Sequence, residues 1–283
     1  MTSVNRKFQK NIFQVWIQGC DKIVKKEFNE NRRNWMTLNP DWNYYCVSEI
    51  ELRKVCYAYN ELCGNIYDSL KIMHLKIDLG RYVYLYLYGG MYADMDAYVL
   101  RSLGHSNEIK DLINSYEIEN KHILGLSTIH VNTLESLVVS GGTKVLNNAV
   151  MFSSKENPLL KQFIDLVLEN IKNMGSGTGS TFFDVSTLTG PMAVNRFFQK
   201  YTNANLPGYA IHIFPSTIFE PCAYTQPCDI TDNTLSIHKM ELSWVPKGIN
   251  KMMSLYYIVK NNIPWILFAS FLYYTNFKDR KKR

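Results

Sequence analysis

The chain has 283 residues, of which 46% are apolar and 20% are charged. This composition allows a buried core and excludes a globally disordered chain. The net charge is +6, but residues 278–283 alone carry +4 of it, so the rest of the chain is close to neutral. A nucleic-acid binder normally spreads basic residues over a folded face, so this distribution argues against nucleic acid as a partner.

In chain order, residues 11–17 are an expected strand, followed by a helix that Asp21 caps and that ends near Leu38. Residues 42–47 form a second expected strand, and Ser48 with Glu51 forms a capping box that opens the next helix.

Further elements follow the same alternation. A helix over 69–88 is expected to end at Gly89-Gly90, with a short strand at 91–93 directly after it. Other expected strands and helices cover 122–127, 149–153, 158–172, a helix after Pro191, 209–214 and 234–238. Strands that alternate with helices predict an α/β fold with a mostly parallel or mixed sheet.

The six cysteines contain no CxxC pair, which argues against a structural zinc site. Cys222 and Cys228 flank a proline-containing turn and would be able to pair in an oxidising compartment, but free buried thiols are the favoured interpretation. Residues 1–11 are polar and charged and do not read as a signal peptide. Localisation stays open between a membrane of the Golgi or ER type and the cytoplasm.

The C-terminal segment differs in character from the rest. Residues 263–277 are almost entirely apolar and aromatic, and the basic residues 278–283 follow at once. Fifteen residues are fewer than the roughly 20 that a helical span needs. Two interpretations stay open: a membrane-surface or re-entrant anchor with basic residues at the lipid headgroups, and a terminal helix packed on the domain.

The most informative segment is 74–103. His74, Asp78 and Arg81 share one face of the expected helix. An acid and an arginine in fixed relation can grip a polar ligand, whereas the spacing alone also fits an ion pair on a solvated face.

The acidic pair Asp94 and Asp96 directly follows the strand at 91–93. In an extended chain these two carboxylates project to the same side. Two like charges so close are unfavourable unless a cation lies between them. Hard oxygen ligands suit Mn²⁺ or Mg²⁺, so the motif predicts a divalent cation with room for phosphate oxygens.

The run from Asp78 and Arg81 through Gly89-Gly90 to Asp94 and Asp96 resembles the DxD-containing sugar-binding region of glycosyltransferase family 32. This family includes α-1,6-mannosyltransferases and inositol phosphorylceramide mannosyltransferases, and the pattern is also similar to the glucosylating domains of large clostridial toxins. Three further segments are similar to family motifs in the correct order: 13–19, 189–191 and 237–244.

The resemblance implies a GT-A-like, Rossmann-like nucleotide-sugar-binding fold with a mixed central sheet. Residues 1–250 would form this domain and 251–283 the tail. In the donor site, Trp16 would stack on the nucleotide base, unless it is a core residue of the first strand. Asp78 and Arg81 would hold sugar hydroxyls, and the remaining donor-site candidates are Tyr92, Asn148 and Trp244.

For catalysis, the resemblance assigns Asp94 to the ribose or sugar and Asp96 to the metal. His238, Glu241 and Ser243 would complete the metal site, and with Trp244 they would close over the diphosphate. The implied reaction is a retaining, metal-dependent transfer of a hexose, with mannose preferred, from a GDP- or UDP-sugar. The acceptor would be a hydroxyl of a glycan or glycolipid, and the product an α-linkage formed by front-face attack.

Three other classes fit the residues less well. A dehalogenase-type phosphatase also has DxD after a strand, but it requires Thr or Val where this chain has Tyr98. A P-loop hydrolase is excluded because the sequence has no GxxxxGK[ST] motif. A catalytically degenerate sugar- or nucleotide-binding protein of the same fold is the alternative, but it would be expected to lose Asp94 or Asp96.

Overall fold

The computed structural model describes residues 6–129, 144–174, 184–202, 204–222 and 228–239. Six strands form one sheet in the order β2-β1-β3-β6-β5-β7. Their bounds are β1 Asn11–Val15, β2 Asn43–Val47, β3 Gly90–Ala93, β5 His122–Thr128, β6 Leu146–Ser153 and β7 Tyr209–Phe214. β6 runs antiparallel to both β3 and β5, whereas the other neighbouring pairs are parallel. The predicted α/β class with a mixed central sheet is therefore confirmed.

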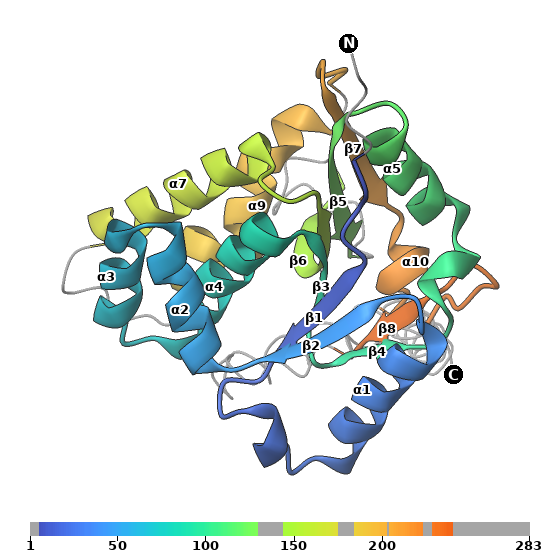
Figure 1. Cartoon of the computed structure of the whole chain (residues 1–283), viewed down its shortest axis with the longest axis horizontal. Coiled ribbons are helices and arrows are strands. Elements are labelled where there is room, and N and C mark those ends of the chain that lie inside the picture. The colour runs from blue at the N-terminus through green and yellow to red at the C-terminus, as the bar shows by residue number, and fades with distance from the viewer. Residues whose placement is uncertain (1–5, 130–143, 175–183, 203, 223–227, 240–283) are drawn as a thin grey trace, which may run out of the picture.

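Helices cover both faces of this sheet (Figure 1). One face carries α2 Glu49–Tyr59, α3 Glu61–Ser69, α4 Met73–Tyr88, α7 Pro158–Asn173 and α9 Pro191–Phe198. The other carries α1 Lys26–Leu38, α5 Asn107–Glu117 and the short α10 Ser216–Phe219. Short turns of other helix types are η1 Cys20–Lys22, η2 Leu103–His105, η3 Val185–Thr189 and η4 Gln199–Tyr201.

The two faces hold two separate hydrophobic cores because successive strand residues point to opposite sides of a sheet. In β1, Phe13 enters the core beneath α4 and α7, and its neighbour Ile12 enters the core beneath α1 and α5. Tyr92 and Met91 divide in the same way in β3. The strand that precedes the DxD motif is thus buried on both sides, and this burial fixes the position of the motif at its end.

The predicted helix boundaries agree best with the structure where the sequence contains a recognisable helix cap. Ser48 and Glu51 form the predicted capping box at the start of α2. The helix predicted from Asp21 begins only at Lys26, because the chain stays extended at Ile23 to bury that side chain. The helix predicted over 69–88 was also wrong at its start: α3 ends at Ser69, and the chain is extended at Leu70, which is buried, before α4 begins.

The favoured interpretation of Cys222 and Cys228 as free thiols was wrong, and a second disulfide was not predicted. Cys20 pairs with Cys46 and Cys222 pairs with Cys228. Cys20 follows β1 and Cys46 lies on the neighbouring β2, so the sheet brings the first pair to a Cα–Cα distance of 6.0 Å despite 26 residues of separation. Only Cys56 and Cys63 are free among the described residues, and both are buried.

A third feature of the molecule is a small second sheet. β4 Ala97–Val99 pairs antiparallel with β8 Ser236–His238, and Ala97 lies opposite His238. The apolar segment 263–277 and the whole predicted tail 251–283 lie outside the described residues. Within the described part of the chain, no helix combines the length and apolar character needed to cross a membrane.

Candidate active site

The DxD motif is set in place by two glycines. Gly89 and Gly90 have φ values of 66° and 107°, which other residues rarely adopt, and they turn the chain from α4 into β3. A Cβ at Gly90 would lie 2.4 Å from the backbone oxygen of Asn11 on β1. Glycine therefore lets β3 pair closely with β1, and Asp94 and Asp96 emerge at the end of β3.

The turn that carries the two acids is held from its backbone. Buried Gln14 donates from Nε2 to the carbonyl of Asp94 at 2.8 Å. Buried Asn31 of α1 donates from Nδ2 to the carbonyls of Met95 and Ala97, at 3.2 and 2.9 Å. With its carbonyl groups occupied in this way, the turn presents the Asp94 and Asp96 side chains in one arrangement.

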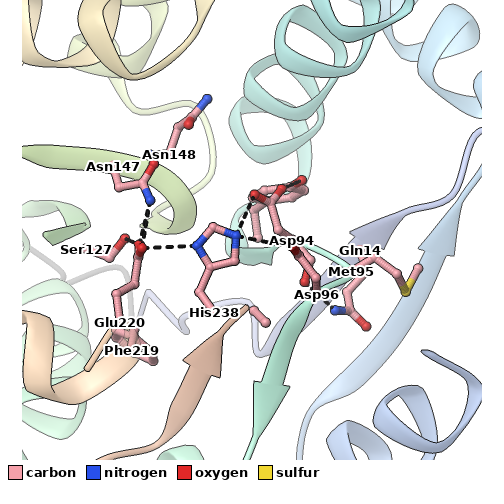
Figure 2. Close-up of polar contacts among 12 residues, drawn as sticks. Gln14, Asp94, Met95, Asp96, Ser127, Asn147, Asn148, Phe219, Glu220 and His238 are labelled. Atoms are coloured by element: carbon pink, nitrogen blue, oxygen red, sulfur yellow. Dashed lines mark hydrogen bonds and ion pairs between the residues drawn. The ribbon is translucent and has the colours of Figure 1, made fainter. Parts of the chain in front are cut away.

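His238 completes a cluster with these acids (Figure 2). The β4–β8 pairing brings the imidazole to the turn, where Nε2 lies 3.3 Å from Asp96 Oδ1 and 3.7 Å from Asp94 Oδ2. One ligand atom from each of the three residues lies within 4.8 Å of the others. Two carboxylates and an imidazole are a set of ligands that suits Mn²⁺. The two carboxylates are also suitable ligands for Mg²⁺.

The electrostatics of His238 reflect this crowding of acids. Burial would lower the pKa of its imidazole, but the carboxylates of Asp96 and Glu220 outweigh burial and raise the pKa well above the ordinary value. The protonated ring thus supplies positive charge between the acids. A metal ion binds only neutral imidazole, so ion binding at this site is coupled to loss of that proton.

Asp78 and Arg81 lie directly beneath Asp94. They pair with each other at 3.2 Å on α4, as their spacing predicted, and Arg81 Nη1 reaches Asp94 Oδ1 at 3.1 Å. The alternative of a solvated surface pair was wrong, because the two side chains are only 7% and 9% exposed. His74 lies one turn earlier on α4 and is half-buried, and burial lowers its pKa.

Two other predicted residues join this network. Asn148 on β6 donates from Nδ2 to Asp78 Oδ1 at 3.2 Å and accepts at its backbone carbonyl from Arg81 at 3.0 Å. The Tyr92 hydroxyl donates to Asp94. Burial raises the pKa of Asp94, against the opposing effect of the Arg81 guanidinium. The structure therefore brings Asp78, Arg81, Tyr92, Asp94 and Asn148 together as one cluster, which is buried except for the partly exposed Asp94.

Trp16 lies just beyond β1 and packs edge-on against Phe28, with ring centroids 5.5 Å apart. This packing favours the structural interpretation of Trp16. Its buried Nε1, however, has no hydrogen-bond partner in the described part of the chain, and neither has Nε of Arg81. Buried donors without partners are uncommon, and a bound ligand or water is one way to satisfy them.

Three predicted residues, Glu241, Ser243 and Trp244, lie outside the described residues. Two others were missed. Thr189 on η3 donates to Asp78 Oδ2 at 2.7 Å, and the Thr-Gly-Pro motif at 189–191 was the signal that would have identified it. Glu220 lies behind His238 at 3.1 Å and is fully buried. No local pattern marks this glutamate, because its partners are distant in sequence.

Comparison with known proteins agrees with this geometry. Residues 25–118 match the family model described as "glycosyltransferase sugar-binding region containing DXD motif". The match includes Asp78, Arg81, Tyr92, Asp94 and Asp96. The predicted resemblance to the DXD-containing sugar-binding region of glycosyltransferases is thereby confirmed for this segment.

The chain is similar to two relatives by sequence and to one solved structure. The chain is 26% identical to the uncharacterized glycosyltransferase L373 of Acanthamoeba polyphaga mimivirus, over 83% of each chain. It is 28% identical over 126 residues to the initiation-specific alpha-1,6-mannosyltransferase of Candida albicans, covering 43% of this chain and 32% of the relative. It resembles the PaToxG glycosyltransferase with a TM-score of 0.44 and 15% identity, over 69% of this chain and 70% of that one.

Proposed function

We propose that the chain is a retaining hexosyltransferase that uses a divalent cation and a nucleotide-sugar donor. The observation that carries the proposal is the convergence of Asp94, Asp96 and His238 at the end of the DxD strand, with ligand atoms within 4.8 Å. These three residues would hold Mn²⁺ or Mg²⁺. The cation would act as a Lewis acid toward the diphosphate leaving group.

The residues of the chain have distinct tasks in this reaction. Arg81 orients Asp94 through their 3.1 Å contact and balances its negative charge. Asp78 is held by Asn148 and Thr189 next to Arg81. We place the donor sugar over this cluster, where Asp78 and Arg81 would meet its hydroxyls and Tyr92 would line the pocket.

We propose front-face attack for the transfer. The bond from the anomeric carbon to the phosphate oxygen breaks, the acceptor oxygen bonds to the same carbon on the same face, and its proton passes to the departing phosphate. The proposal rests on the state of two carboxylates, that of Asp78, which is buried, and that of Asp94, which is 24% exposed. Asp78 and Asp94 are both engaged by Arg81 and by hydroxyl or amide donors, so neither is free to act as a nucleophile.

Mannose is the preferred sugar because one relative carries a mannosyltransferase name. A hydroxyl of a glycan or glycolipid is the proposed acceptor. The apolar and basic composition of 251–283 supports a membrane-surface contact for that segment beyond a catalytic domain of residues 1–250. Co-sedimentation of the full chain with anionic liposomes, compared with the chain truncated after Asn262, tests the segment. Equal binding of both chains would contradict this assignment.

The function is tested by measuring release of nucleoside diphosphate from a panel of GDP- and UDP-sugars with Mn²⁺. We expect one donor to be cleaved well above the others, with release lost in EDTA and in Asp96→Asn. Asp165→Asn, an exposed acid of α7, is the matched control and should keep full release. Release that persists in Asp96→Asn would contradict the metal site. Nucleotide binding without release, even with mannosyl and lipid acceptors, would favour a degenerate binding protein.

A further inference from the structure

We propose that Glu220 is a positioning residue for His238: it holds the imidazole by Nδ1 so that Nε2 faces Asp94 and Asp96 as a metal ligand. The inference rests on the proposed function, because it requires His238 to bind the cation. It goes further in giving a task to a residue outside every motif of the sequence. Glu220 follows α10, more than 120 residues after the DxD pair in the chain.

The imidazole of His238 lies between the carboxylate of Glu220 on one side and those of Asp94 and Asp96 on the other (Figure 2). Nδ1 is 3.1 Å from Glu220 Oε2, and Nε2 on the other side of the ring is 3.3 Å from Asp96 Oδ1. When Nδ1 carries the proton and donates it to Glu220, Nε2 keeps its lone pair on the side of the two aspartates. A carboxylate that accepts from the second nitrogen of a ligating histidine fixes both the tautomer and the ring orientation.

Glu220 is itself held rigidly. Asn147 Nδ2 lies 2.8 Å from each carboxylate oxygen, and Ser127 Oγ donates to Oε1 at 2.8 Å. Ser127 and Asn147 belong to β5 and β6, which are neighbouring strands of the main sheet. The chain of contacts thus runs from the central sheet through Glu220 to His238, and the ring cannot rotate without breaking it.

A purely structural role is the competing explanation. A fully buried carboxylate is costly unless it is well hydrogen-bonded, and three donors around one carboxylate meet that requirement. Glu220 would then only tie α10 to the sheet. The two roles differ in a measurable way: positioning acts on metal affinity through His238, whereas a structural tie acts on stability alone.

The test measures the affinity for Mn²⁺ alone, using the loss of the free-ion EPR signal as the readout. It compares four proteins: wild type, Glu220→Gln, His238→Ala and the double variant. We expect Glu220→Gln to weaken Mn²⁺ binding about 10- to 100-fold. The double variant should bind no more weakly than His238→Ala, because Glu220 acts through that ring. Asn157→Ala, which removes a buried cap of α7 away from the site, should lower stability and leave the affinity unchanged.

The outcomes separate the two proposals. If wild type and Glu220→Gln bind Mn²⁺ equally well, the positioning role is overturned and the proposed function still stands. Wild type with no more affinity than Asp96→Asn overturns the metal site and this inference with it. Additive losses in the double variant also overturn the positioning role. If Glu220→Gln does not fold, Asn147→Ala, which frees the carboxylate to move, takes its place, and an unchanged affinity overturns the inference.

Discussion

Thr189 shows how much a single hydroxyl contributes to this site. It donates at 2.7 Å to the carboxylate of Asp78, a buried residue. We expect Thr189→Val, which keeps the shape but removes the donor, to lower the free energy of unfolding by about 1–3 kcal/mol. Urea denaturation measures the effect. Thr189→Ser keeps the hydroxyl and should cost less than the valine variant, and the reverse order would contradict the role assigned to this bond.

Residues differ in how far the sequence predicts them, and the reason is the distance of their partners. Asp78 and Arg81 are three residues apart on one helix, so spacing alone placed them together. Asp94 and Asp96 follow a strand that two glycines introduce, which is also a local pattern. Glu220 meets residues 127, 147 and 238, and no periodicity within its own segment carries that information.

At the level of elements, the close pairing of β3 with β1 depends on Gly90. It has a φ of 107°, and a Cβ there would overlap the Asn11 carbonyl oxygen on β1. Gly208 offers a matched control, because its φ is 82° and no atom lies within 4 Å of its added Cβ. Gly208→Ala should cost about 1–2 kcal/mol of stability from the backbone conformation alone. Gly90→Ala should cost clearly more in the same urea titration; equal losses would mean that β1 and β3 adjust freely.

The pair α2 and α3 is joined by a bidentate ion pair. Arg53 donates to both oxygens of Asp68, at 2.7 and 2.6 Å, and Tyr57 donates at 2.8 Å. These hydrogen bonds lower the pKa of Asp68 to about 2, and the bond from Arg53 has the largest effect. Because the folded pKa is below the unfolded value, the stabilisation is full above about pH 4 and is lost as the pH falls through 2.

We therefore expect Asp68→Asn to melt below wild type between pH 5 and 7, with the difference shrinking from about pH 4 and vanishing only below about pH 2. Thermal unfolding followed by circular dichroism across this range checks the prediction. Asp232→Asn removes a fully exposed acid whose nearest contact with Arg101 is 3.9 Å, so it should change little at any pH. A deficit in Asp68→Asn that is independent of pH would exclude the ion pair as its cause.

Element boundaries followed local chemistry only where a cap defined them. The capping box at Ser48 was predicted correctly because its two residues and their bonds lie within one turn. The break between α3 and α4 was not predicted, since the chain opens there to bury Leu70 in the core of the whole domain. The Cys20–Cys46 bond was missed for the same reason: it depends on β1 and β2 being neighbours.

At the scale of the whole molecule, the order of the strands in the sheet was not predicted from the sequence. Alternation of helices and strands indicated an α/β class, but it did not reveal that β6 enters antiparallel between β3 and β5. That insertion has a functional consequence. It places Asn147 and Asn148 next to the DxD strand, where one holds Glu220 and the other holds Asp78.

The proposed cation would join parts of the chain that the sequence separates widely. Asp94 and Asp96 follow β3 of the main sheet, and His238 ends β8 of the small sheet. A ligand that binds only the folded chain stabilises it by about 2.7 kcal/mol at a concentration 100 times its Kd. We therefore expect Mn²⁺ to raise the melting temperature of the whole chain relative to EDTA, with a single transition. Asp96→Asn should lose this rise, whereas Asp232→Asn should keep it. An equal rise in Asp96→Asn would place the stabilising ion elsewhere on the molecule and would separate its effect from the DxD turn.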